Sequence, residues 1–202
     1  MLKKQVELYL ARKINEASAK GAIDLHSEER EYIDRNGLLE GVEHPIKELP
    51  QEKRFEGAYL ERGDKETEEF LGEESADFFR QPITYFKKHK NEFIYVESEW
   101  WEIVGVDAVS FEADDVFGTY DVMLGLKLQK KYDSAIKSFL KENLLGDGEG
   151  FDLMFDSNEG IWSLNFALKG VKGYQEDMTI SEAYTLIYGF LFRLAEWVEG
   201  YK

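Results

Sequence analysis

The sequence predicts an α+β fold, in which a mostly antiparallel sheet of about five strands packs with helices. Two observations lead to this prediction. Residues 91–202 contain several runs of alternating apolar and polar residues, which is the pattern of half-buried strands. Residues 2–20 and the segment after Thr179 instead carry apolar residues at helical spacing. Helices gathered around a run of antiparallel strands are typical of the α+β class.

The 202 residues are expected to form one domain, residues 1–202. A hydrophobic fraction of 43% and an aromatic fraction of 14% are sufficient to build a core. Within the domain, residues 1–90 are predicted to be mainly helical. Residues 91–202 are predicted to form the sheet together with two helices, one mid-chain and one C-terminal.

The N-terminal part contains four segments with helical patterns: residues 2–20, 27–35, 64–71 and 75–90. Gly21 is placed to end the first helix, and Ser27 is placed to cap the second. Pro82 is expected to limit or kink the fourth. Residues 37–63 are predicted to be a long irregular connection, because prolines and glycines interrupt them and their apolar residues are isolated.

From Glu92 onward, β-branched and aromatic residues become frequent. The predicted strands are residues 93–96, 101–111, 120–128, 151–155 and 162–168. Residues 157–160, Ser-Asn-Glu-Gly, are expected to join the last two strands as a hairpin. The mid-chain helix is expected to run from Asp133 to about Leu145.

The C-terminal helix has the clearest start signal in the chain. Thr179 and Glu182 stand at the spacing of a capping box, in which each side chain binds the other residue's backbone amide. Beyond this start, the small and polar residues fall on one narrow stripe, and the rest are large and apolar. A helix that is apolar over most of its circumference must be largely buried.

Negative charge is concentrated in the second half of the chain. The net charge of the whole chain is −16. Between Asn91 and Leu126 there are nine acids and no lysine, arginine or histidine, and residues 142–168 also lack bases. If the strands of both segments share one sheet, one face or rim would hold carboxylates with few counter-charges nearby. Ordinary solvation of exposed strand residues is the alternative explanation.

This acidic region supplies the candidate contact residues for a partner. Trp100 and Trp101 are included because, on a strand, adjacent rings point to opposite faces, so that an exposed ring could anchor a contact. Packing in the core, or coverage by the N-terminal helices, is the favoured alternative for this pair. The candidate residues are Glu97, Glu99, Trp100, Trp101, Glu102, Glu112, Asp114, Asp115 and Asp121.

Catalytic and metal-binding motifs are not recognisable in the sequence. The chain has no cysteine and no Gly-x-Ser-x-Gly motif, and its three histidines are scattered, so no catalytic residue, metal or cofactor is predicted. The loop at residues 146–150 is glycine-rich and is predicted to be a plain turn. The alternative is a cation-binding loop in which Asp147, Glu149 and Asp152 supply the oxygen ligands. A pair of carboxylates could also catalyse hydrolysis, but the sequence does not single out one pair among its many acids.

The leading hypothesis is therefore a non-enzymatic protein-binding module of the cytoplasm, in which an acidic sheet surface contacts a basic protein. Direct binding to nucleic acid or to an anionic membrane is disfavoured by repulsion of like charges. The N-terminal residues lack the apolar run of a signal peptide. The alternatives are a small-ligand-binding protein or carboxylate-dependent hydrolase with a pocket between sheet and helices, and an inhibitor that mimics DNA. The oligomeric state is left open.

Overall fold

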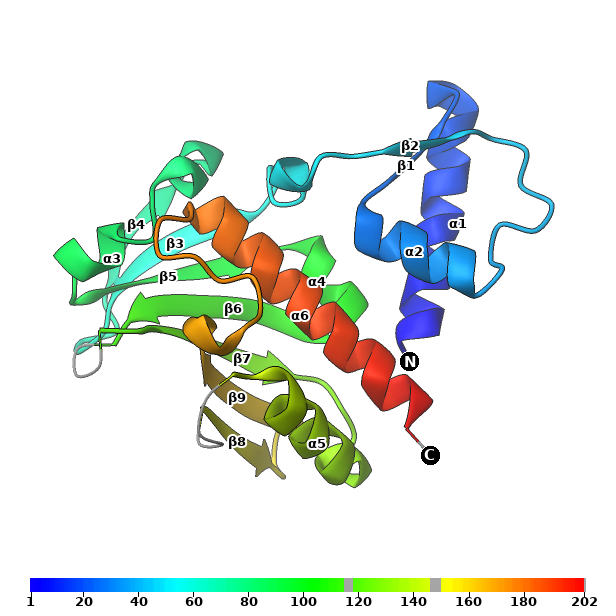
Figure 1. Ribbon diagram of the computed structural model, residues 1–202. Coiled ribbons are helices and arrows are strands. Elements are labelled where there is room, and N and C mark those ends of the chain that lie inside the picture. The colour runs from blue at the N-terminus through cyan, green and yellow to red at the C-terminus, as the bar shows by residue number, and fades with distance from the viewer. Residues whose placement is uncertain (115–117, 146–149, 202) are drawn as a thin grey trace.

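The computed structural model describes residues 1–114, 118–145 and 150–201, and its centre is a seven-stranded antiparallel sheet (Figure 1). The strand order is β4-β3-β5-β6-β7-β9-β8. The strands are β3 (Tyr59–Asp64), β4 (Phe70–Glu74), β5 (Glu92–Glu97), β6 (Val106–Ala113), β7 (Tyr120–Leu126), β8 (Phe151–Asp156) and β9 (Ile161–Ala167). The α+β class is confirmed, and the sheet is larger than the predicted five strands.

The C-terminal helix α6 (Ile180–Gly200) packs across one face of this sheet. Its capping box is present as predicted, because Thr179 and Glu182 exchange side-chain and backbone hydrogen bonds. Tyr184 lies fully buried where the helix crosses the sheet, and its hydroxyl donates to the carbonyl oxygens of Ile94 at 3.4 Å and Val109 at 3.1 Å. The prediction of a buried C-terminal helix is therefore correct.

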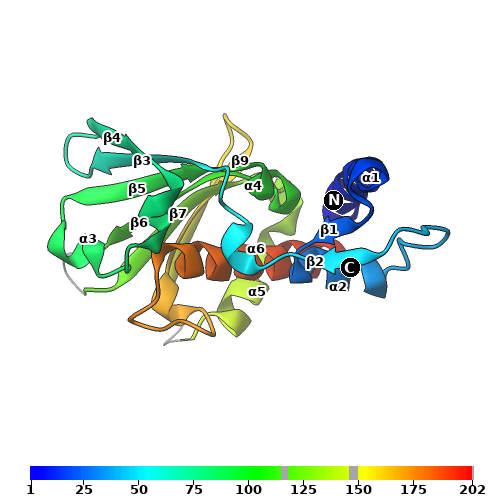
Figure 2. The same ribbon diagram turned by 90° about the horizontal axis from the view of Figure 1, so that it is seen from above.

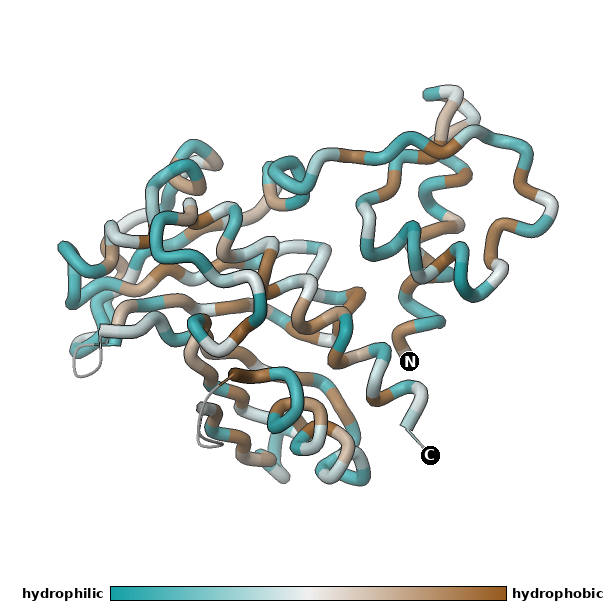
Figure 3. Tube along the Cα trace, viewed as in Figure 1, coloured by the Kyte–Doolittle hydropathy of each residue, from teal (hydrophilic) through white to brown (hydrophobic). Residues whose placement is uncertain are grey.

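Shorter elements complete this side of the core. Helix α5 (Asp133–Asn143) lies beside α6 (Figure 2), where the rings of Phe139 and Phe190 are 5.3 Å apart. Hydrophobic residues recur along the strands and along α6 (Figure 3). The remaining short helices are η1 (Gln51–Lys53), η2 (Ala76–Arg80), α3 (Tyr85–Lys88), α4 (Glu99–Val104), η3 (Lys130–Tyr132) and η4 (Leu168–Gly170). None of the helices among the described residues has the length and apolarity needed to cross a membrane.

An N-terminal unit lies at the end of the sheet, beside α4 and the C-terminal half of α6 (Figures 1 and 2). Its elements are α1 (Leu2–Lys20), β1 (Ile23–Leu25), α2 (Ser27–Arg35) and β2 (Ile46–Glu48). Strands β1 and β2 pair in parallel as a separate two-stranded sheet. Gly21 ends α1 in the left-handed conformation, as expected, but Ser27 does not cap α2, because its hydroxyl donates to Glu28 instead.

Residues 37–74 differ most from the sequence prediction. The connection expected to be irregular contains β2, η1 and most of β3, and the helix expected over residues 64–71 is a turn that leads into β4. Asp64 explains the turn, because its carboxylate accepts hydrogen bonds from the backbone amides of Glu66 and Thr67, both at 2.9 Å. Pairing of β3 with β5 then outweighs the local helical pattern. Only short helices, η2 and α3, form within residues 75–90.

The predicted strand over residues 101–111 begins later than expected. Ser98 caps the short helix α4, accepting a hydrogen bond from the amide of Trp100 at 3.4 Å. Gly105 ends that helix with φ of 75°, a conformation that glycine adopts without strain, and β6 starts at the next residue. The hairpin of β8 and β9 is confirmed.

Burial of α6 leads to a stability prediction. Leu194 is fully buried on α6, so Leu194→Ala is expected to lower the free energy of unfolding by roughly 2–5 kcal/mol, measured by denaturant titration. The matched control is Leu8→Ala on α1, where the leucine is 58% exposed and the loss is expected to stay below about 0.5 kcal/mol. Equal losses for the two variants would show that α6 is peripheral to the core.

Candidate functional site

The sheet has one covered face and one open face. Helices α5 and α6 lie on one side of it, and none of the helices that the structure describes lies over the middle of the other side (Figure 2). Alternation along the strands therefore divides their side chains. Ile94 and Val96 of β5 are buried towards α6, whereas Tyr95 and Glu97 face the other way. We call the second side the open face.

Carboxylates lie on the open face from edge to edge. Six of the seven strands contribute at least one, by the same alternation and by the register of strand pairing. They are Glu73 of β4, Glu61 of β3, Glu97 of β5, Glu112 of β6, Asp121 of β7, and Asp152 and Asp156 of β8. The two base-free segments of the sequence thus supply strands to one sheet.

The base-free segment is not free of bases in space. Among the described residues, at least four acids of this segment are paired with cations from other parts of the chain: Glu92 with Arg62 at 2.8 Å, Glu99 with Arg12 at 2.7 Å, Glu112 with Lys65 at 3.5 Å, and Asp107 with Lys127. The expectation of few counter-charges is therefore wrong for these positions. Sequence neighbours do not decide pairing here, because strand order brings β3 and α1 next to the acidic segment.

The two tryptophans are not surface anchors. Trp100 is 8% and Trp101 0% exposed, because both lie on helix α4 and not on a strand. The indole nitrogen of Trp101 donates to the carbonyl oxygen of Val96 at 3.1 Å. Trp100 packs against His26, with ring centroids 4.9 Å apart. The hypothesis of an exposed ring is wrong, and the favoured alternative of core packing or coverage by the N-terminal helices is confirmed.

The remaining candidate residues fall into two groups. Glu97, Glu112 and Asp121 lie together on the open face, and Glu112 stands directly opposite Asp121 across the strand pair. Burial, followed by the charge of Asp114, raises the pKa of Asp121. Glu99 and Glu102 lie apart on α4, beside α1. Asp115 lies outside the described residues, as do Asp147 and Glu149 of the glycine-rich loop.

Two tyrosines on the open face, Tyr59 and Tyr95, were missed in the sequence. Tyr59 donates from its hydroxyl to Glu61 at 2.8 Å, and Tyr95 donates to Glu97 at 2.9 Å. The signal was present, since the pattern Tyr-apolar-Glu occurs at residues 59–61 and again at 95–97. On a strand this spacing places both polar groups on one face. The signal could not be used because residues 59–61 were not recognised as a strand.

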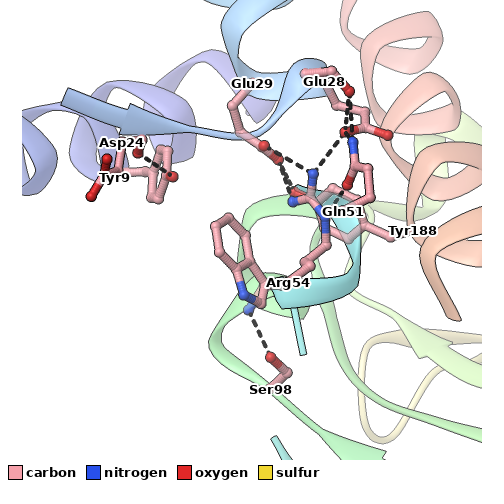
Figure 4. A network of polar contacts seen from close by, with 10 residues as sticks. Tyr9, Asp24, Glu28, Glu29, Gln51, Arg54, Ser98 and Tyr188 are labelled. Atoms are coloured by element: carbon pink, nitrogen blue, oxygen red, sulfur yellow. Dashed lines mark hydrogen bonds and ion pairs between the residues drawn. The ribbon is translucent and has the colours of Figure 1, made fainter. Parts of the chain in front are cut away.

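A buried ion network joins the N-terminal unit to the rest of the protein (Figure 4). The guanidinium of Arg54 binds both carboxylate oxygens of Glu29, at 2.9 and 3.1 Å, and Glu28 at 2.7 Å. Tyr188 of α6 donates to Glu29, and its ring lies 3.9 Å from the guanidinium carbon of Arg54. Arg54 and Glu29 are 2% and 0% exposed, so this network is structural and closed to a ligand.

Three surface hollows bear on the hydrolase alternative. The largest two measure about 670 Å³, between α5 and α6, and about 610 Å³, at the N-terminus of α6. In the second, hydrogen bonds from Thr179 lower the pKa of Glu182. The third, about 410 Å³, contains Asp114, Asp121 and Asp152, and burial raises the pKa of Asp121 there. Within the described ranges, no group of three or more acids or histidines is arranged to hold a metal ion.

The network predicts that an unpaired Glu29 is costly. Arg54→Met is expected to lower the free energy of unfolding by about 3–5 kcal/mol, because it leaves a carboxylate buried without its cation. Adding Glu29→Met is expected to recover part of this loss. Arg12→Met, which breaks the exposed pair with Glu99, serves as the control and is expected to cost less than about 1 kcal/mol. Denaturant titration of all four proteins, wild type included, tests these expectations, and equal losses for Arg54→Met and Arg12→Met would contradict the buried pairing.

His26 predicts a pH dependence of stability. Burial, followed by the charge of Arg54, lowers the pKa of His26 to about 4 in the folded protein. An unfolded histidine titrates near about 6.5, so between these values the unfolded chain takes up a proton that the folded protein does not. Stability therefore falls as the pH is lowered through this range. When the pH is lowered from about 6.5 to about 4, the free energy of unfolding of the wild type is expected to fall by roughly 2–3 kcal/mol more than that of His26→Gln, measured by urea titration.

His44→Gln is the control for this measurement and is expected to keep the wild-type dependence on pH. If His26→Gln also keeps it, then His26 takes up its proton in the folded state and its predicted burial in the neutral form is wrong.

Comparisons with known proteins leave the geometry as the basis for a functional proposal. No family model matches the chain. No curated protein and no solved structure matches it either.

Proposed function

We propose that this protein is a non-enzymatic, cytosolic binding module that contacts a basic protein partner through the open face of its sheet. The observation that carries the proposal is the placement of carboxylates from six strands on a face that no described helix covers. The net charge of −16 adds a long-range field of the same sign. Such a field accelerates encounter with a positively charged surface and repels phosphates.

The open face also carries side chains that can supply contact area. Tyr59 is 38% exposed and Met154 is 65% exposed, while Tyr95 and Met123 are half-buried. Tyrosine and methionine are enriched in protein interfaces, where charged groups alone contribute little affinity. These residues take the role that the sequence had suggested for a tryptophan.

The alternatives receive less support. A hydrolase that uses two carboxylates needs one of them kept protonated by its surroundings. Burial raises the pKa of Asp121 in one hollow, which supplies one member of such a pair but does not identify the second. A DNA mimic needs acids placed like the phosphates that follow the two strands of a duplex. On the open face, Glu112 is instead paired with Lys65, and tyrosines alternate with Glu61 and Glu97. A basic protein surface has no such requirement for spacing.

The proposal is tested by removing three charges from the open face. The wild-type protein is expected to capture a basic protein from lysate at low salt. The variant Glu97→Gln, Asp121→Asn, Asp152→Asn is expected to associate with that captured protein at least about tenfold more slowly than wild type does. The rate is measured with the purified captured protein by surface plasmon resonance. High salt is expected to weaken the wild-type complex.

The control variant removes three exposed charges outside the sheet, by Glu40→Gln, Glu142→Gln and Asp177→Asn. It has the same net charge as the open-face variant, and it is expected to retain most of the wild-type rate. An equal fall for the two variants, or a captured protein that is not basic, would contradict binding through the open face.

A further inference from the structure

Four side chains at one end of the open face form a quartet: Tyr59 and Glu61 of β3 with Tyr95 and Glu97 of β5. The strands are antiparallel, and Tyr59 stands opposite Glu97 while Glu61 stands opposite Tyr95. Each tyrosine hydroxyl donates to the glutamate two residues further along its own strand. Around the quartet, each tyrosine ring is therefore followed by a carboxylate, and the patch is about as wide as the distance between two neighbouring strands.

The quartet differs from the opposite end of the open face in its charge balance. Glu112, near the far end of the central strand β6, lies 3.5 Å from the ammonium group of Lys65. Among the residues that the structure describes, no basic side chain forms an ion pair with Glu61 or Glu97. Glu73, directly opposite Glu61 on β4, adds a third carboxylate. Glu61, Glu73 and Glu97 thus place three carboxylates together at this end of the face.

The hydrogen bonds within the quartet leave it short of donors. Tyr59 and Tyr95 occupy one oxygen of each carboxylate, Oε2 of Glu61 and Oε1 of Glu97. The other two oxygens accept no hydrogen bond from a described residue. The negative neighbours Glu61, Glu73 and Glu97 also contribute to the raised pKa of Tyr59, after its hydrogen bond to Glu61 and some burial. A ligand with several N–H donors and a positive charge would supply hydrogen bonds to these free oxygens and would neutralise the negative charge.

We infer that the quartet receives an arginine side chain of the basic partner, a conclusion that rests on the proposed function and adds the contact group to it. A guanidinium is planar, carries five donors and stacks on aromatic rings, so it matches two carboxylates set beside two tyrosines. An ammonium group has the charge but lacks the planar fork and the stacking surface. The quartet therefore favours arginine over lysine.

The test uses the full chain and two defined probes, acetylated tetra-arginine amide and acetylated tetra-lysine amide. Each is titrated into ¹⁵N-labelled protein at low ionic strength, and the amide shifts give the site and the dissociation constant. Tetra-arginine is expected to shift residues 59–63 and 93–97 most, and to bind more tightly than tetra-lysine. Glu61→Gln with Glu97→Gln is expected to weaken tetra-arginine binding at least about fivefold.

The matched control is Asp121→Asn with Asp152→Asn, which removes the same charge from the same face but lies two or more strands away from β5. It is expected to weaken binding less than about twofold. Tyr59→Leu with Tyr95→Leu, which removes the rings, is expected to abolish the preference for arginine.

Three results would overturn the quartet as the arginine site: no tetra-arginine binding by wild type, equal losses in the two charge variants, or equal affinity for the two peptides. Equal losses would leave the proposed function intact, because the open face would then act as a diffuse charge. The proposed function itself fails if the three-charge variant of the open face captures the basic partner as well as its control does, or if the captured protein is not basic.

Discussion

Helix α6 needs apolar cover around nearly its whole circumference, and most of the architecture follows from this need. The sheet covers one side, α5 a second, and α4 with the N-terminal unit the rest. Two tyrosine hydroxyls are buried with the helix and require partners. Tyr184 finds two strand carbonyls, and Tyr188 finds the carboxylate of Glu29. A buried carboxylate in turn requires a cation, which Arg54 supplies from the connection into β3.

The same arrangement determines which face of the sheet is open to the proposed partner. Because α6 takes one face of the sheet, the other face keeps its polar side chains in contact with solvent. Glu112 on that face has a cation close by in Lys65. Glu61 and Glu97 instead share hydrogen bonds with tyrosines. That difference in local chemistry is the reason for assigning the contact to one end of the face.

Local signals in the sequence predicted the elements whose stabilising groups are also local. The capping box of Thr179 and the alternation in residues 151–167 are of this kind. Residues 64–71 were misassigned because their charged residues suit a helix, whereas their structure depends on pairing with β3. The Trp100–Trp101 pair was misassigned because a single serine cap and one glycine turned an expected strand into α4. Neither the Arg54 network nor the quartet could be predicted, since their members come from separate elements.

The position of α6 along the chain has a consequence for synthesis. The strands pair mostly with neighbours in sequence, so the sheet can assemble while the chain is still being made. Its apolar face then lacks its cover until residues 168–200 have been added, which takes roughly 2–7 s at ribosomal speed. During that interval the nascent chain exposes the rows of Ile, Val and Phe that later contact α6. We therefore expect the nascent chain to be most prone to aggregation just before translation reaches the end of this helix.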